Sequence, residues 1–186
     1  MTDQRHEYLS VLLRYYEEEL VGEAYFLGLC NIFERPDQQQ KLKLLADVEF
    51  HSVRGARSLI AKYELETRDL DTLAEIGGNY ARAYEHWSWN ELVEYMAKRY
   101  PGYLDDFAYL ESLAPDEDLP PLEFLTQHEV AAIEFANREL AGDDDSSEPL
   151  RRYLCATPPS VSGIKSRGPY SKPRRAQLAP ERTATV

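Results

Sequence analysis

Four glutamates stand where the apolar stripes of predicted helices should continue. Residues three and four positions apart share one face of a helix. On this spacing, Glu19 and Glu23 interrupt the apolar stripe of the first predicted helix, Glu49 that of the second and Glu129 that of the last. Buried carboxylates that lack a compensating charge take up protons or attract cations. Because two divalent ions balance four carboxylates, and because oxygen ligands suit iron and manganese, the pattern predicts a buried metal centre.

Three more side chains are candidate ligands. Glu111 lies on the inward face of a shorter predicted helix, where Asp106 is an equally good alternative on a slightly rotated face. His51 and His128 each stand next to an inward glutamate in the sequence, but both lie off the central stripe. We therefore expect these histidines to be either supplementary nitrogen ligands or hydrogen-bonding residues beside the core.

Tyrosine is abundant, with 13 residues in the chain. Most of these tyrosines are expected to fill the core and to send their hydroxyl groups to its edge. Tyr16 is the exception that we single out as a catalytic candidate, because it lies one helical turn from Glu19. Glu17 and Glu18 fall outside the apolar stripe and are expected to be solvated.

The elements that position these groups are predicted to be helices, because sustained alternation with a period of two is absent. The Gly77-Gly78 pair predicts a helix break, and the proline-rich segment 115–121 predicts a loop. The broken region from Gly77 to Tyr100, with Trp87 and Trp89, is expected to cover a substrate pocket. Long helices are predicted over residues 3–33, 37–63 and 122–140, and shorter ones over 69–76, 80–87, 89–100 and 103–113.

With these inward carboxylates, the chain resembles the ferritin-like superfamily, and in particular its dimetal-carboxylate proteins. The resemblance covers about residues 5–142 and is carried by ELVGE with Glu19 and Glu23, LLADVEFHS with Glu49, and LTQHEVAAIEFANREL with Glu129. It implies an all-α four-helix bundle with a broken third segment. It also implies two bound iron ions, or manganese in their place, and the oxidation or hydroxylation of a small organic molecule by dioxygen.

The sequence departs from that family in having no Glu-x-x-His motif. Ser52 follows Glu49 by three positions, and Ala132 follows Glu129. A second hypothesis is therefore a metal-free scaffold or interaction protein of the same fold, with its glutamates paired to arginines or to the basic tail. Iron storage is a third, but it requires a shell-forming oligomer, which the irregular middle segment and the basic tail disfavour.

Charge and composition restrict the partners. The 186 residues carry a net charge of −12, yet residues 160–186 hold six Lys or Arg against one Glu, so the preceding body is more acidic still. An acidic body disfavours nucleic acid, and no apolar run in the sequence is long enough to cross a membrane. Two cysteines without metal-type spacing, and no secretory leader pattern, predict a cytoplasmic protein.

Two regions are expected along the chain. Residues 1–155 form the helical domain, in which Gly142 follows the last long helix and the short piece LRRYLC docks on the bundle. Residues 156–186 are rich in Pro, Ser and Arg and are expected to be a disordered tail. The oligomeric state is left open, with a homodimer among the alternatives.

Overall fold

A computed structural model describes residues 2–159 of the chain, and this part is helical without a strand. The all-helical prediction is therefore confirmed for the described residues. Most of the predicted tail, residues 160–186, lies outside them. The α-helices are α1 (Thr2–Leu29), α2 (Pro36–Lys62), α3 (Leu70–Arg82), α4 (Trp89–Arg99), α5 (Tyr103–Leu113), α6 (Leu119–Leu140) and α7 (Glu148–Cys155), and the 3-10 turns are η1 (Tyr100–Gly102) and η2 (Asp116–Asp118).

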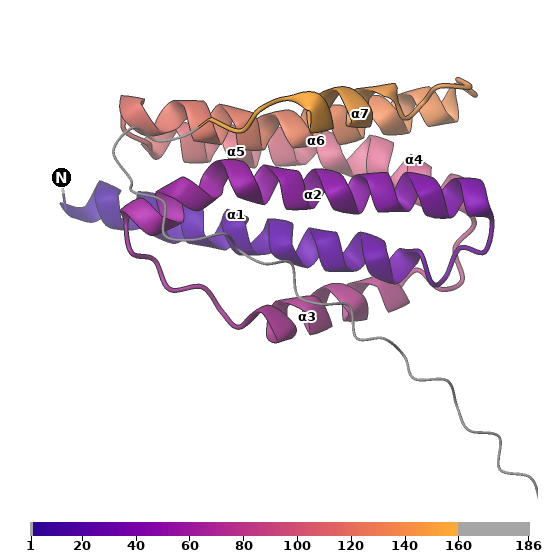
Figure 1. The fold of residues 1–186 in the computed structure, drawn as a ribbon, viewed down its shortest axis with the longest axis horizontal. Coiled ribbons are helices and arrows are strands. Elements are labelled where there is room, and N and C mark those ends of the chain that lie inside the picture. The colour runs from indigo at the N-terminus through magenta and orange to yellow at the C-terminus, as the bar shows by residue number, and fades with distance from the viewer. Residues whose placement is uncertain (1, 160–186) are drawn as a thin grey trace, which may run out of the picture.

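The long helices α1 and α2 lie side by side, and α3 packs on α1 at the edge away from α6 (Figure 1). Helix α6 packs on α2, while α4, η1 and α5 follow one another along α6. The short helix α7 lies on α2 and α6, as predicted for LRRYLC, and the Tyr153 hydroxyl donates a hydrogen bond of 3.0 Å to the carbonyl oxygen of Phe124. Within the described residues, no helix is both long enough and apolar enough to cross a membrane.

The core has two apolar halves. One half contains Phe26 of α1, Leu45 of α2 and Phe135 of α6, and the other contains Leu12, Leu59 and Leu125 of the same three helices. On each of the three helices, the buried glutamate predicted from the sequence lies between its contributions to the two halves. The apolar halves therefore enclose a polar layer at mid-height.

Helix α3 continues through Gly77-Gly78, so the predicted break is wrong. Asp69 caps the start of this helix by accepting a hydrogen bond from the Thr72 backbone nitrogen, at 3.0 Å. The helix is held by close packing on α1, which outweighs the low helix propensity of two glycines. It ends at Arg82, so the helix predicted over residues 80–87 is wrong beyond that residue.

We expect Gly77→Ala to destabilise the protein and Gly78→Ala, its matched control, to stabilise it. A Cβ at position 77 would overlap the Val21 carbonyl oxygen and lie 2.7 Å from the Ala24 Cβ, whereas a Cβ at position 78 would meet nothing within 4 Å. Forcing the two helices apart costs about 1–3 kcal/mol, and alanine at an open helical position gains about 0.5–1 kcal/mol. Denaturant unfolding of both variants measures the difference. Equal effects at the two positions would contradict the packing argument.

Helix α6 begins earlier than predicted, because the expected loop at 115–121 contains η2 and the first turn of the helix. Proline is tolerated in a first turn, where its missing N–H has no helical partner to lose. Asp118, just before α6, is fully buried and accepts hydrogen bonds from the Tyr8 hydroxyl at 2.9 Å and the Tyr63 hydroxyl at 2.6 Å. Lys62 pairs with its other oxygen at 2.5 Å. This network fixes the start of α6 against α1 and α2.

Glu17 is buried, and the prediction that it is solvated is wrong. Its carboxylate accepts hydrogen bonds from the Arg68 backbone nitrogen at 2.6 Å and from Arg68 Nε at 2.7 Å. These bonds attach the connection between α2 and α3 to α1. Glu18 is exposed, as predicted, and its Oε1 lies 3.9 Å from Arg14 Nε.

Candidate functional site

Four ionisable side chains meet in the polar layer between the apolar halves. Helix α1 contributes Glu19, α2 contributes Glu49, and α6 contributes both His128 and Glu129. Their exposed fractions are 5%, 7%, 1% and 5%, respectively. The three glutamates are buried as their helical spacing predicts. His128 is buried as well, because the inward face of α6 is wide enough to include two adjacent positions, and the expectation that it lies off the central face is wrong.

His128 is at the centre of this cluster. Its Nε2 lies 2.9 Å from Glu19 Oε2, 3.5 Å from Glu129 Oε2 and 3.6 Å from Glu49 Oε2. Its Nδ1 faces the backbone carbonyl oxygen of Leu125. A carbonyl oxygen can only accept a hydrogen bond, so Nδ1 must carry the proton. In the neutral ring, Nε2 therefore presents its lone pair to the three carboxylates, which is the arrangement of a histidine that binds a cation.

Burial raises the pKa of all three carboxyl groups. The pKa of Glu19 is raised to about 7, although hydrogen bonds to this group, including one from Ser52 Oγ at 3.1 Å, act in the opposite direction. Burial raises the pKa of Glu129 to about 8. The pKa of Glu49 is raised well above its ordinary value by burial and then by the charge of Glu19. The metal-free cluster therefore retains protons near neutral pH, and a bound cation would displace them.

The cluster fits a metal ion in its donor chemistry. A carboxylate oxygen of Glu19, one of Glu49 and a ring nitrogen of His128 lie within 4.8 Å of one another. Glu129 Oε1 is buried and has no hydrogen-bond partner within residues 2–159. Among the described residues, His128 is the one basic side chain within ion-pair distance of these three glutamates. The metal-free hypothesis requires arginine partners, and the charge of Arg99 lowers the pKa of Glu129 against the larger effect of burial.

Gly22 leaves room for the Glu49 carboxylate to pack against α1. A Cβ at this position would lie 2.9 Å from Glu49 Oε2 and 3.0 Å from its carboxyl carbon. Gly22 sits one turn after Glu19 on α1, in the motif ELVGE. The small residue therefore allows a carboxylate from α2 to reach the face of α1 that carries Glu19.

Two of the predicted carboxylate ligands lie outside this four-residue cluster. Glu23 is half-buried on α1, and its charge contributes to raising the pKa of Glu49. It is not among the side chains whose atoms one ion could touch together. Glu111 is at the end of α5, where it accepts a hydrogen bond from the Thr126 hydroxyl at 2.5 Å.

His51 and Tyr16 also lie elsewhere. His51 Nε2 is 2.9 Å from the Ala156 carbonyl oxygen, and its ring packs edge-on against Phe124 and Tyr153. It therefore connects α2 to the segment after α7, in keeping with the hydrogen-bonding role that the sequence left open. Tyr16 is buried in the apolar half formed near the start of α1.

A cavity of about 510 Å³ extends to the cluster. Its exposed lining residues are Glu18 of α1, Asn79 and Tyr80 of α3, and Ala83 just after α3. Its buried lining residues include Glu19, Glu49, His128 and Glu129. Neither Trp87 nor Trp89 lines it; Trp89 instead donates a hydrogen bond to Glu139 at 2.8 Å. Seven tyrosines line the cavity: Tyr15, Tyr25, Tyr80, Tyr84, Tyr95, Tyr100 and Tyr103.

These seven tyrosines are the part of the site that the sequence did not reveal. The sequence predicts that most tyrosines fill the core, and it singles out Tyr16 rather than its neighbour Tyr15 as a catalytic candidate. Tyr15, not Tyr16, lines the cavity. The usable signal was the concentration of tyrosine in residues 80–103, which hold five of the seven.

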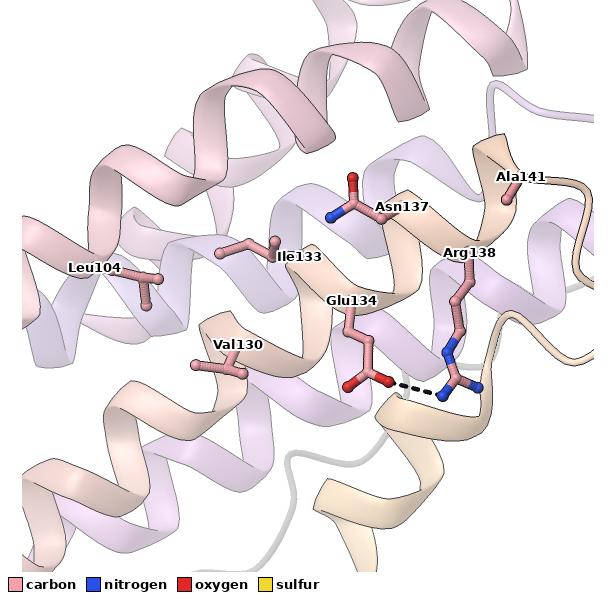
Figure 2. Close-up of a pocket in the computed structure, with 7 residues that line it drawn as sticks. All are labelled: Leu104, Val130, Ile133, Glu134, Asn137, Arg138 and Ala141. Atoms are coloured by element: carbon pink, nitrogen blue, oxygen red, sulfur yellow. Dashed lines mark hydrogen bonds and ion pairs between the residues drawn. The ribbon is translucent and has the colours of Figure 1, made fainter.

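A second hollow, of about 500 Å³, lies beside α6 near the start of α5 (Figure 2). Its charged lining residues are Glu134 and Arg138, which pair with each other at 2.8 Å. The lining contains aliphatic side chains and no histidine, so it offers no comparable chemistry. Its residues are Leu104, Val130, Ile133, Glu134, Asn137, Arg138 and Ala141.

Comparison with known proteins gives no match to a family model, to a curated protein or to a solved structure. The function must therefore be argued from the cluster and the cavity themselves.

Proposed function

We propose that the chain is a metal-dependent oxidoreductase that uses dioxygen to oxidise a small organic molecule. Its metal is iron, or manganese in its place. The ligands are Glu19, Glu49 and His128, which one ion could contact together, with Glu129 beside them as a further carboxylate. The observation that carries the proposal is the orientation of His128. Its Nδ1 is committed to the Leu125 carbonyl oxygen, which leaves Nε2 facing three buried carboxylates.

The donor set supports the choice of metal. Carboxylate oxygens and one imidazole nitrogen suit iron and manganese, and no thiolate of a soft-metal site lies in the cluster. Two ions, as the resemblance to dimetal-carboxylate proteins implies, would draw on Glu23 as a further carboxylate. In that arrangement α1, α2, α6 and the combined α4–α5 segment are the four helices of a ferritin-like bundle.

The chemistry that such a metal centre supplies is the reduction of dioxygen. The chain's own residues provide the surroundings for that chemistry. The cavity holds the organic molecule beside the cluster, and the two apolar halves exclude water from above and below. Before metal binds, burial raises the pKa of Glu129 to about 8, so this carboxyl group holds a proton that a bound cation would displace.

Iron loading tests this proposal. The protein is loaded anaerobically with ferrous iron, separated from free metal and exposed to air in an oxygen electrode. We expect one or two ions per chain and oxygen uptake that follows the iron content. Glu49→Gln should lose both, whereas Glu94→Gln, an equal charge change at an exposed position of α4, should keep both. Iron well below one ion per chain, unchanged by Glu49→Gln, would refute the proposal.

A metal-free scaffold is the second candidate, and one observation favours it. Protons retained at high pKa, together with the Ser52 hydroxyl and His128, already compensate the buried carboxylates in part. A scaffold of this kind would show the same melting temperature with and without chelator after metal loading. A bound metal would instead stabilise the folded state.

A further inference from the structure

Five tyrosines form one continuous surface of the cavity, which we call the tyrosine wall: Tyr25, Tyr84, Tyr95, Tyr100 and Tyr103. Adjacent ring centroids are 5.6 Å apart for Tyr25 and Tyr84, 5.7 Å for Tyr84 and Tyr95, 6.5 Å for Tyr95 and Tyr100, and 5.6 Å for Tyr100 and Tyr103. All five line the cavity that ends at the cluster. A molecule in this cavity is therefore in contact with the faces or edges of several aromatic rings.

The acidic and basic side chains that line the same cavity are acidic, with one exception. Four glutamates line it with His128, and the part of the chain that the structure describes contributes no lysine or arginine to the lining. Glu18 stands at the exposed end, and Glu129 stands at the inner end with Oε1 buried and without a partner. Glu18 lies outside the cluster, so it remains an acidic group at the entrance when metal is bound, with Arg14 Nε 3.9 Å from its Oε1.

We infer that the cavity binds a small organic ammonium ion, whose cationic group lies against the tyrosine wall and between Glu18 and Glu129. Aromatic faces attract cations through the ring quadrupole, and this attraction grows where water is excluded. The unpartnered Oε1 of Glu129 is an acceptor that an N–H group of the ligand would satisfy. The claim that this ammonium ion is the substrate rests on the proposed function. The claim that the cavity binds it does not.

Other ligand classes fit the same surroundings less well. A carboxylate or phosphate would meet four glutamates, and the one basic lining side chain, His128, already faces three of them through Nε2. A neutral aromatic molecule would pack on the rings but leave Glu129 Oε1 without a cationic partner. The volume of about 510 Å³ is within the range of small-molecule sites and suits an amine with an aryl or short alkyl body.

Calorimetric titration with three probes of one size tests the inference. Phenethylamine is cationic at about pH 7, 2-phenylethanol is neutral and phenylacetate is anionic. We expect the amine to bind at least about tenfold more tightly than the alcohol and the carboxylate to bind most weakly, in both metal-free and iron-loaded protein. Equal affinities for the amine and the alcohol, or tighter binding of the carboxylate, would overturn the inference.

Three variants, each checked for folding by circular dichroism, locate the binding. Glu18→Gln and Tyr84→Leu should each weaken phenethylamine binding several-fold, and Glu18→Gln should leave the binding of neutral 2-phenylethanol nearly unaffected. Tyr84→Phe keeps the ring and should retain the affinity, and Glu94→Gln is the charge-matched control away from the cavity. Unchanged amine affinity in both Glu18→Gln and Tyr84→Leu would place the ligand elsewhere and overturn the inference.

The two proposals fail in distinguishable ways. Selective amine binding by a protein that does not hold iron would support the ligand class and refute the oxidoreductase. Stoichiometric iron with oxygen uptake, but no preference for the amine, would support the oxidoreductase and refute the ligand class.

Discussion

His128→Ala is expected to lower the affinity for iron or manganese by at least about 100-fold. Loss of a partner that merely orients a ligand already costs about 10–100-fold in affinity. His128 is the nitrogen donor of the cluster, and its Nε2 lies within 3.6 Å of all three carboxylates. Metal titration of chelator-treated protein, with metal content measured after desalting, gives the result directly.

His51→Ala is the matched control for that variant. From the sequence alone, the two histidines are equivalent candidates, since each is close to an inward glutamate. The structure separates them, because His51 bonds to the Ala156 carbonyl oxygen at 2.9 Å and lies outside the cluster. We expect His51→Ala to lose some stability and to keep its metal. His128→Gln retains more of the side-chain volume, so it is a second variant with a lower risk of misfolding. Wild-type metal content in both His128 variants would contradict the assignment.

Without metal, the stability of the folded protein is expected to fall as pH rises from about 5 to about 8.5. Burial raises the pKa of Glu19 to about 7 and that of Glu129 to about 8, from an ordinary value of 4.5. Between these values the folded chain binds more protons than the unfolded chain, so stability is lost with increasing pH. A tenfold difference in proton affinity between the folded and unfolded chains corresponds to about 1.4 kcal/mol, and the expected loss is of the order of several kcal/mol.

Denaturant unfolding in the presence of chelator, at a series of pH values, measures this dependence. Glu129→Gln should flatten the curve, because the amide stays neutral throughout the range. Saturating metal should flatten it too, since a bound cation favours the ionised carboxylates. Stability that increases over this pH range in the metal-free protein would show that the cluster is not buried as described.

Helical periodicity was sufficient to predict the helical architecture and the inward position of three glutamates. Leu122, Leu125 and Ala132 mark a face of α6 on which Glu129 must point inward. The same periodicity could not show whether His128 is buried. When a buried face is broader than one residue, a position next to its centre can lie either inside or outside the core. A structure was needed to show that His128 and Glu129 both point into the cluster.

Other features depend on contacts between segments that are distant in the sequence. Glu17 is buried because Arg68, 51 positions away, folds over it. Gly77 is helical because α1 approaches it closely, which no local propensity reports. The tyrosine wall unites α1 with the region from α3 to α5, so its rings become one surface only after those helices are packed. The resemblance to a ferritin-like bundle remains a proposal.

The most direct test of the metal centre is an anomalous-difference map from crystals of the iron- or manganese-loaded protein. We predict a peak in the polar layer between α1, α2 and α6, within coordination distance of Glu19, Glu49 and His128. A loaded crystal with no peak in this layer, or with peaks confined to surface carboxylates, would contradict the account.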